Sequence, residues 1–374
     1  MQILESKTNT EQQFYDSVFV ISHSTKTVST YKTGINHLKT FLQSECGFDE
    51  IQLADKIKQN EIDVFEFIRL VIIYLDKKGI KPKGMRSYLS GIKGYMRFLG
   101  IKINSDDYKT LVKIPKVVRT REIPLTKELI AQLLRNSTRK LSTGILVIVA
   151  SGMRIGELVQ LKLSDIDFES KPTKITIRGN TSKSRCTRET FLTTEATNAL
   201  KDYLKHYFGW IDGSKNEHLL DTYIFWRISK RKSSKKVPQF NPEYAKSNFQ
   251  ISLTEQISKI PELNIKNENG QKAIHFHALR KFFRTNAGNV SGRDFAEALM
   301  GHSFYMDTYY QLPEDEKKQM YLDVEPHLTI SDTQAVERNL KTLSAKHFQL
   351  ETKVDELMQY LRTNSIEVPD FLSS

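Results

Sequence analysis

The chain has 374 residues, enough for two or three domains with hydrophobic cores of ordinary size. Its 56 Lys and Arg residues outnumber 44 Asp and Glu residues, and the formal charge of +12 favours a polyanionic partner such as double-stranded DNA. The two cysteines, Cys46 and Cys186, form neither a CxxC pair nor a disulfide framework, which indicates a reducing compartment. The polar residues 1–13 and the short apolar run at residues 145–150 predict no secretory signal and no membrane span. We therefore expect a cytoplasmic protein.

Residues 25–104 are expected to form a small helical bundle, because apolar side chains recur there at steps of three and four. Three apolar stripes share this spacing: Tyr31, Ile35, Leu38 and Leu42; then Val64, Phe67, Ile68, Val71, Ile72 and Leu75; then Tyr88, Ile92, Tyr95, Met96 and Leu99.

A basic stretch overlaps the end of this bundle. Between Lys77 and Arg121 there are 13 Lys or Arg residues and two acidic residues, Asp106 and Asp107. A charge run is usually a solvated face, but this imbalance favours contact with a DNA backbone. The expected DNA-binding residues here are Lys77, Lys81, Lys83, Arg86, Lys93, Arg97, Arg119 and Arg121. The segment 113–121 lacks helical periodicity and is interpreted either as an exposed linker or as a strap along the DNA.

The second half opens with helices. Thr126 is placed to cap a helix that begins at Lys127, and an apolar helix follows as far as Ala150. Gly152 then allows a turn that points Arg154 away from the core. After Asp167 the apolar pattern changes to period two, which predicts a β-hairpin with Lys183 at or just after its tip.

Two later segments are polar and charged. Residues 227–236 hold six basic residues, including Arg231 and Lys232, and form either a phosphate-binding loop or a disordered surface loop. The end of the chain shows a seven-residue apolar repeat, which predicts a coiled coil or else a single amphipathic helix packed on the preceding domain. The repeat consists of Val336, Leu340, Leu343, His347, Leu350, Val354, Leu357 and Leu361.

Three short motifs supply the parts of a phosphoryl-transfer site that needs no metal. They are SGMRIGEL at residues 151–158, HALR at residues 277–280, and MGHS at residues 300–303 followed by Tyr309 and Tyr310. Two arginines can clamp the oxygens of one phosphate, histidines can move protons, and a tyrosine hydroxyl can attack phosphorus. Each motif alone is weak evidence in a basic protein, whereas the ordered set is specific.

The order and the residue types resemble those of the tyrosine recombinases, the phage-integrase family that also includes the Xer enzymes. The resemblance extends from about Thr25 to Leu322. The extension past Tyr310, including residues 326–330, is more similar to archaeal integrase-like proteins than to bacterial Xer enzymes.

The resemblance implies a mainly α fold with a small β-sheet (α+β). We predict an N-terminal tail (1–24), a helical core-binding DNA-clamp domain (25–113), a linker (114–124) and a catalytic domain (125–328). A C-terminal coiled-coil or amphipathic helix (329–364) and a tail (365–374) complete the chain.

The resemblance also implies roles for the motif residues, with no cofactor and no metal. Arg154 and Arg280 would clamp the scissile phosphate, and Glu157 would buttress them. Alternatively, Arg154 makes only a helix-terminal ion pair with Glu157. Lys183 would be the general acid that protonates the departing 5′ oxygen. Arg178, Arg185 and Arg188 on the same hairpin stay open as alternatives to it.

The remaining roles fall on two histidines and a tyrosine. His277 would share the phosphate site with Arg280, and His302 would hydrogen-bond the phosphate or position the nucleophile. Tyr310 is the expected nucleophile because it is eight residues after His302, closer to the usual family spacing of about nine than Tyr309.

These roles imply a site-specific DNA recombinase that binds double-stranded DNA and works as a homotetramer on two duplexes. The free protein would be a monomer or a dimer. The alternatives are a type IB topoisomerase, which relaxes one duplex, and a DNA-binding regulator that retains the fold without the reaction.

Overall fold

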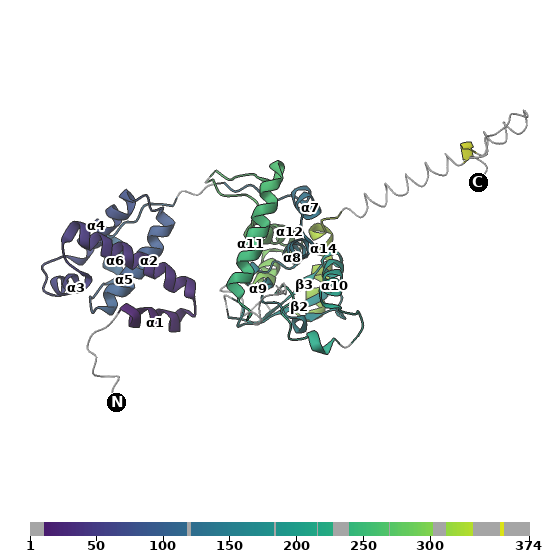
Figure 1. Cartoon of the computed structure of the whole chain (residues 1–374), viewed down its shortest axis with the longest axis horizontal. Coiled ribbons are helices and arrows are strands. Elements are labelled where there is room, and N and C mark those ends of the chain that lie inside the picture. Colours follow the sequence, from purple (N-terminus) through teal and green to yellow (C-terminus); the bar gives the residue numbers. More distant parts are fainter. Residues whose placement is uncertain are drawn as a thin grey trace, which may run out of the picture. The chain divides into compact units, whose positions relative to one another are not determined.

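The computed structural model describes residues 11–117, 121–182, 185–214, 216–226, 239–268, 270–301, 312–331 and 352–354. The chain divides into two compact units, Met1–Arg119 and Thr120–Ser374, shown in Figure 1. The division falls inside the predicted linker 114–124. The bounds of the predicted domains stay predictions, and almost all of the heptad segment lies outside the described residues.

The first unit is helical. Its helices are α1 (Glu11–Ser22), α2 (Thr25–Phe41), α3 (Glu50–Lys58), α4 (Val64–Lys77), α5 (Pro82–Phe98) and α6 (Ser105–Leu111), and a π-helical turn, Leu42–Cys46, follows α2. Side chains from the three predicted apolar stripes, such as Leu38, Leu75 and Met96, are fully buried in its core.

Two glycines let α2 and α5 pack closely. A Cβ atom on Gly34 would lie 2.8 Å from the carbonyl oxygen of Tyr88, and one on Gly91 would lie 2.9 Å from the Cα of Tyr31. Real Cβ atoms do not approach so closely, so a larger residue at either position would separate the two helices.

Helix α1 differs from the prediction, which leaves residues 1–24 as a tail. Phe14, Tyr15 and Val18 of this helix are buried against Ile35 and Tyr95 of the bundle. The physical reason is that these three side chains lie on one face of the helix at steps of one and three, which gives α1 an apolar face to bury.

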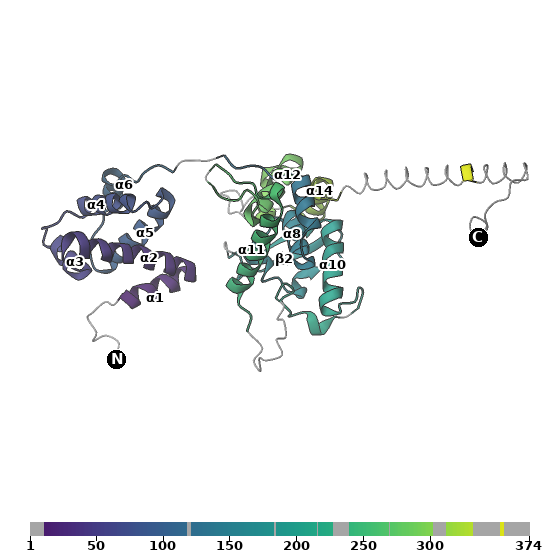
Figure 2. The ribbon, with the colours of Figure 1, turned by 45° about the horizontal axis from the view of Figure 1, so that its top comes forward.

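The second unit is built around α8 (Arg139–Ser151), whose side chains from Thr143 to Ser151 are all buried. The surrounding helices are α7 (Lys127–Arg135), α9 (Ile155–Leu158), α10 (Thr194–Phe208), α11 (Pro242–Lys259), α12 (Phe276–Ser291), α13 (Arg293–Met300) and α14 (Glu314–Leu328). Figure 2 shows α10, α11, α12 and α14 around α8, and each of the four contacts it.

A small antiparallel sheet contacts one side of α8. Its strands are β1 (Ile166–Asp167), β2 (Thr173–Ile177) and β3 (Arg188–Leu192), in that order. The pairing of β2 with β3 runs from Thr173 opposite Leu192 to Ile177 opposite Arg188. The prediction of a mainly α fold with a small sheet and a hairpin is therefore confirmed, while Lys183 lies outside the described residues.

The helix ends follow the predicted signals. The Thr126 hydroxyl accepts a hydrogen bond from the Leu129 amide and begins α7. Gly152 ends α8 with φ of 64°, a left-handed conformation that disfavours other residues. The Phe283 ring of α12 packs directly against it, so that a Cβ atom on Gly152 would lie 2.3 Å from the ring.

We expect Gly152→Ala to lower the free energy of unfolding of the second unit by about 2–4 kcal/mol. About 1 kcal/mol comes from placing alanine at positive φ, and the rest comes from displacing Phe283. Both tryptophans of the chain, Trp210 and Trp226, belong to the second unit, so urea unfolding followed by tryptophan fluorescence measures its stability.

Gly209 is the matched control, because its φ is 65° and a Cβ atom there would meet nothing within 4 Å. Gly209→Ala should cost only the backbone part, about 1 kcal/mol. Equal losses in the two variants would contradict the close packing of Phe283 against Gly152.

Candidate active site

Arg154 is held at the start of α9, immediately after the turn at Gly152 and Met153. Its backbone amide donates a hydrogen bond to the Glu157 Oε2 at 2.8 Å, and its Nη1 donates to Oε1 at 3.0 Å. The predicted ion pair with Glu157 is therefore present. It does not exhaust the guanidinium, because the Arg154 side chain keeps 28% of its surface exposed and its other nitrogens can reach a ligand.

The carboxylate of Glu157 is the centre of this arrangement, and its side chain is only 2% exposed. Arg188 on β3 donates from Nη1 to Oε1 at 3.1 Å and from Nη2 to Oε2 at 2.6 Å. Burial disfavours the charged carboxylate, but the hydrogen bond and charge of Arg188, with help from Arg154, outweigh it and hold the pKa of Glu157 below its ordinary value.

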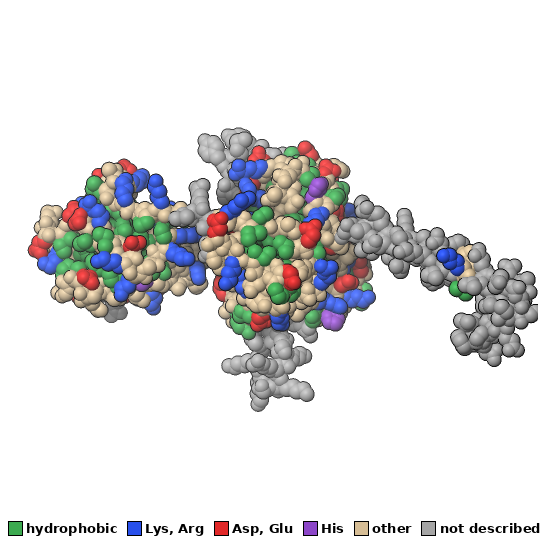
Figure 3. All heavy atoms as spheres, turned by 90° about the horizontal axis from the view of Figure 1, so that it is seen from above, with side chains coloured by type: hydrophobic (Ala, Val, Ile, Leu, Met, Phe, Trp, Pro, Cys, Tyr) green, Lys and Arg blue, Asp and Glu red, His purple; other side chains and the backbone are tan. Residues whose placement is uncertain are grey.

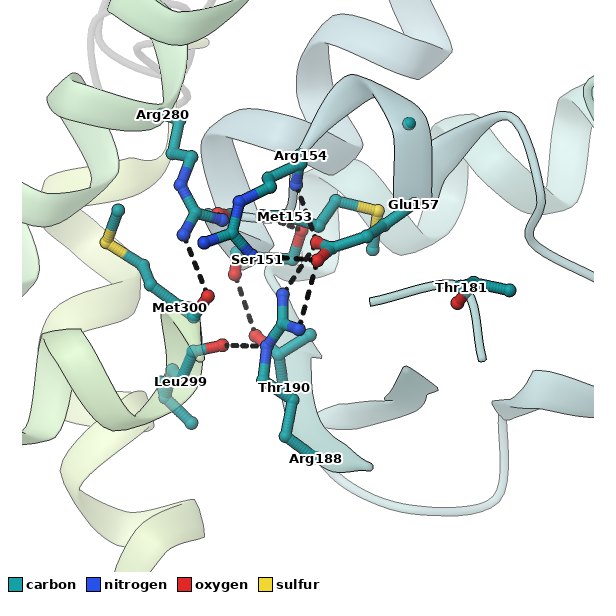
Figure 4. Close-up of polar contacts among 12 residues, drawn as sticks. Ser151, Met153, Arg154, Glu157, Thr181, Arg188, Thr190, Arg280, Leu299 and Met300 are labelled. Carbon is teal, nitrogen blue, oxygen red and sulfur yellow. Dashed lines mark hydrogen bonds and ion pairs between the residues drawn. The ribbon is translucent and has the colours of Figure 1, made fainter. Parts of the chain in front are cut away.

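Arg280 on α12 lies beside Arg154, as Figure 4 shows, and is 2% exposed. Its Nη1 donates to the carbonyl oxygen of Gly152, and its Nη2 donates to the carbonyl oxygen of Met300 at 2.8 Å. These contacts join the first motif, the second motif and the end of α13, where the third motif begins.

The electrostatics of this pair indicate an anion site. Burial, and then the neighbouring charge of Arg154, lower the pKa of Arg280 to about 9. Arg280 still carries its charge at neutral pH, although two guanidinium groups repel each other there. An anion that contacts both would relieve the repulsion, and the planar donor sets suit the oxygens of a phosphate.

His277 is exposed on the first turn of α12, one turn before Arg280. Desolvation by its surroundings, followed by the charges of Lys281, His275 and Arg280, lowers its pKa. Lys281 also contacts Glu122, and that hydrogen bond lowers the pKa of Glu122. A neutral His277 is thereby favoured, which can accept a proton or a hydrogen bond.

Several predicted site residues lie outside the described residues: Lys183, His302, Tyr309, Tyr310, Arg119, Arg231 and Lys232. Their roles stay predictions.

Two of the alternatives to Lys183 are engaged elsewhere. Arg178 lies 3.0 Å from the Oδ1 of Asp165 and donates to the Gln160 carbonyl oxygen, and Arg188 is bonded to Glu157. Arg185, the third, is exposed and has a φ of 57°.

The predicted DNA-binding residues of the first unit have different environments. Figure 3 shows Lys and Arg side chains exposed in groups on its surface. The exposed members that the structure describes are Lys77, Lys81, Lys83, Arg86 and Arg97, while Lys93 is half-buried.

Lys93 and Arg97 contact their own unit. The Lys93 Nζ lies 4.1 Å from the centre of the Tyr108 ring, and Arg97 Nη2 donates to the Ile103 carbonyl oxygen at 2.9 Å. In the second unit, Arg121 is exposed and its backbone amide donates to Glu268 at 3.0 Å. Of the exposed residues Lys77, Lys81, Lys83 and Arg86, the last two lie three residues apart on α5 and so form a pair on one face that can meet a polyanion.

The described residues form neither a metal-ion site nor a membrane-spanning helix. No group of three or more His, Cys, Asp or Glu side chains is placed to hold a metal ion there. Among the helices that the structure describes, none combines the length and apolar character needed to cross a membrane.

A family model for the phage integrase family matches residues 124–311, half of the chain and the part that holds all three motifs. The chain belongs to the phage integrase family. The XerD tyrosine recombinase of Staphylococcus saprophyticus is 22% identical over 313 residues, which cover 81% of this chain and 93% of that protein. The XerA tyrosine recombinase of Thermococcus kodakarensis is 26% identical over 194 residues, 50% of this chain but only 66% of that relative.

Solved structures of integrases share the fold. A lambda integrase dimer bound to a COC' core site matches with a TM-score of 0.52 at 16% identity, covering 81% of this chain and 79% of that chain. The Tn1549 transposon integrase in complex with circular intermediate DNA matches with a TM-score of 0.50 at 18% identity. The match covers 82% of this chain and 97% of that chain. The XerA match supports the resemblance to archaeal proteins. The support is only partial, because XerC proteins match this chain at a similar sequence identity.

The feature that sequence reasoning missed is the position of Arg188. The sequence places it on the hairpin as one of three arginines near Lys183. The local signal was its position at the start of the returning strand of the predicted hairpin, where β3 begins. Nothing in the sequence identified Glu157 as its partner.

We expect Glu157→Gln to destabilise the second unit by about 3–5 kcal/mol at pH 7, because it leaves Arg188 buried without its counter-charge. The folded state lowers the pKa of Glu157 below its ordinary 4.5. Its contribution is therefore complete above pH 4.5 and is lost as the pH falls through the folded value. The difference in the free energy of unfolding between wild type and variant, the stability gap, should therefore shrink below pH 4.5. Urea unfolding followed by tryptophan fluorescence at a series of pH values measures this difference.

Glu189→Gln, one residue from Arg188, is the control. The Glu189 side chain is 36% exposed and lies 3.5 Å from the Lys174 Nζ, so its loss should cost less than about 1 kcal/mol. A gap for Glu157→Gln that stays constant from pH 7 to pH 3 would show that folding does not lower the pKa of Glu157.

Proposed function

We propose that this protein is a site-specific DNA recombinase that cleaves and rejoins strands through a 3′-phosphotyrosyl intermediate. The observation that carries the proposal is the pair formed by Arg154 and Arg280, which lie side by side (Figure 4). His277 is one turn before Arg280 on α12. Membership of the phage integrase family and the tyrosine recombinases among its relatives support the same conclusion.

The first step of the proposed reaction is attack by the Tyr310 hydroxyl oxygen on the scissile phosphorus. The bond from phosphorus to the 5′ oxygen breaks, and Lys183 gives that oxygen a proton. Negative charge that develops on the non-bridging oxygens is stabilised by Arg154 and Arg280. The proton of the Tyr310 hydroxyl passes to His277 or His302, and both histidines can also hydrogen-bond the phosphate.

Rejoining reverses these bonds. The 5′ hydroxyl of a partner strand attacks the phosphotyrosyl phosphorus, Tyr310 leaves, and its oxygen regains a proton. Because the phosphodiester energy is retained in the covalent link, the exchange needs no ATP. The arginines and Lys183 supply the positive charge and the acid that a metal ion provides in other phosphoryl-transfer sites. Lambda integrase has been solved as a tetramer bound to a Holliday junction, and we propose a homotetramer on two duplexes for this chain too.

Two rivals make different predictions. A type IB topoisomerase with a similar residue set would relax supercoils in one duplex and would not exchange strands between two. A DNA-binding regulator with the recombinase fold would bind its site without forming a covalent link. The close placement of Arg154, Arg280 and Glu157 favours a site that still binds a phosphate.

The nucleophile can be identified with a suicide substrate, for which we would first select a duplex from a random-sequence pool by its binding to the full chain. Versions of this duplex nicked at successive positions would be incubated with protein in EDTA and resolved on denaturing gels. We expect wild type and Tyr309→Phe to form a covalent protein–DNA band and Tyr310→Phe to form none.

The other outcomes are equally informative. Loss of the band only in Tyr309→Phe would retain the chemistry and move the nucleophile by one residue. Tight binding of the selected duplex by wild type with no band at any nick position would favour the regulator.

We expect the double variant Lys83→Gln and Arg86→Gln to reduce the salt dependence of duplex binding. Both side chains are exposed on α5, three residues apart and so on one face. Each lost phosphate contact should lower the slope of log K against log salt by about 1. Fluorescence anisotropy of the labelled selected duplex over a KCl series measures this slope.

Lys56→Gln with Lys58→Gln on α3 removes the same charge from another helix of the unit and serves as the control. An equal reduction of the slope in both double variants would indicate attraction by net charge without a localised contact on α5.

A further inference from the structure

We infer that Arg188 is a positioning residue of the phosphate clamp, which holds Glu157 and the end of α13 in place so that Arg154 and Arg280 meet one phosphate. The inference rests on the proposed function. It assigns to Arg188 a role different from the one that its place on the hairpin suggests, which is proton donation beside Lys183.

Each of the three nitrogens of the Arg188 guanidinium donates to a fixed partner. Two parallel bonds reach the two oxygens of Glu157, and Nε donates to the Leu299 carbonyl oxygen at 2.9 Å (Figure 4). The Arg188 side chain is only 8% exposed. Turning Arg188 toward a leaving oxygen would break its two bonds to Glu157 and leave that buried carboxylate without its main counter-charge, so Arg188 acts through Glu157.

Arg188 also joins segments that are distant in the sequence. Through Glu157 it fixes the residue that binds both the backbone and the guanidinium of Arg154. Through the Leu299 carbonyl it fixes the last turn of α13, whose neighbouring Met300 carbonyl accepts from Arg280. Both arginines of the clamp therefore take their positions from groups that Arg188 contacts.

The side chain of Arg188 packs closely on Gly301. A Cβ atom on Gly301 would lie 2.6 Å from the Arg188 Cδ and 2.8 Å from its Nε, and the φ of Gly301 is 66°. The glycine of the third motif is thus required twice, for its conformation and for the space that Arg188 fills.

Lysine should not replace Arg188, because a single ammonium group cannot form the planar two-bond contact with Glu157 while also reaching Leu299. Arg188→Lys and Arg188→Met should therefore slow covalent cleavage of the selected duplex on the order of 100-fold, the usual scale for a misplaced reacting group. Duplex affinity, measured by anisotropy, should change less than about threefold, because contacts spread over many phosphates dominate it.

Arg178→Lys is the matched control. Arg178 also bonds a carboxylate, Asp165, and a backbone carbonyl, that of Gln160, but it has no contact with Glu157. It should lose stability in the tryptophan fluorescence assay and retain the wild-type cleavage rate. Cleavage lost equally in Arg178→Lys and Arg188→Lys would overturn the assignment, because the effect would then be one of general stability.

A substrate with sulfur in place of the bridging 5′ oxygen separates positioning from proton donation. A thiolate leaves without being protonated, so this substrate should restore the rate of a variant that lacks the general acid. We expect rescue of Lys183→Met and no rescue of Arg188→Met. Rescue of Arg188→Met would overturn the inference and make Arg188 the proton donor. Absence of a covalent band in wild type would instead refute the proposed function, and the inference with it.

Gly301→Ala tests the same contact without altering Arg188. It should reduce the cleavage rate as Arg188→Lys does, whereas Gly209→Ala, at nearly the same φ and with open space around it, should not. Wild-type cleavage by a folded Gly301→Ala protein would contradict the requirement for a fixed Arg188.

Discussion

The ion pair between Glu157 and Arg188 is the contact on which the rest of the candidate site depends. Both side chains are removed from water, 2% and 8% exposed, so their attraction is largely offset by the cost of desolvation. The pair is for that reason a poor source of net stability. The ion pair instead restricts the segments that carry Glu157 and Arg188 to one arrangement, because either charge without its partner in that interior is strongly unfavourable. A strand, a short helix and the end of α13 are thereby fixed relative to one another.

The same interior must also hold Arg280 close to Arg154, and two helix ends explain how it does so. Gly152 follows the last turn of α8 and Met300 ends α13, and both carbonyl oxygens accept hydrogen bonds from Arg280. The carbonyl end of a helix carries partial negative charge, which stabilises a nearby cation by about 0.3–1 kcal/mol. Two such ends offset part of the repulsion from Arg154, so that Arg280 stays charged although its pKa is lowered to about 9.

How much the sequence could predict follows from the range of each interaction. Local signals were sufficient for the cap at Thr126, the turn at Gly152, the period-two hairpin and the buried stripes of the bundle, because each depends on neighbours a few residues away. The packing of Phe283 on Gly152 and the pairing of Arg188 with Glu157 were not predictable, since they join residues 131 and 31 positions apart. Among three hairpin arginines, only tertiary contact separates the one that is buried from those near the surface.

The charge of the assembled site fits the proposed reaction. Arg154, Arg188 and Arg280 against the carboxylate of Glu157 leave two net positive charges at the site, and the nearby carboxylate of Glu297 is paired with Arg284. A phosphodiester brings one negative charge, and attack by an oxygen nucleophile develops a second one at phosphorus in the transition state. A site with two excess positive charges therefore stabilises the transition state more than it stabilises the bound substrate. This difference is the condition for lowering the barrier. Because Arg188 is neutralised by Glu157, that excess is carried by Arg154 and Arg280, the two arginines that can contact the phosphate.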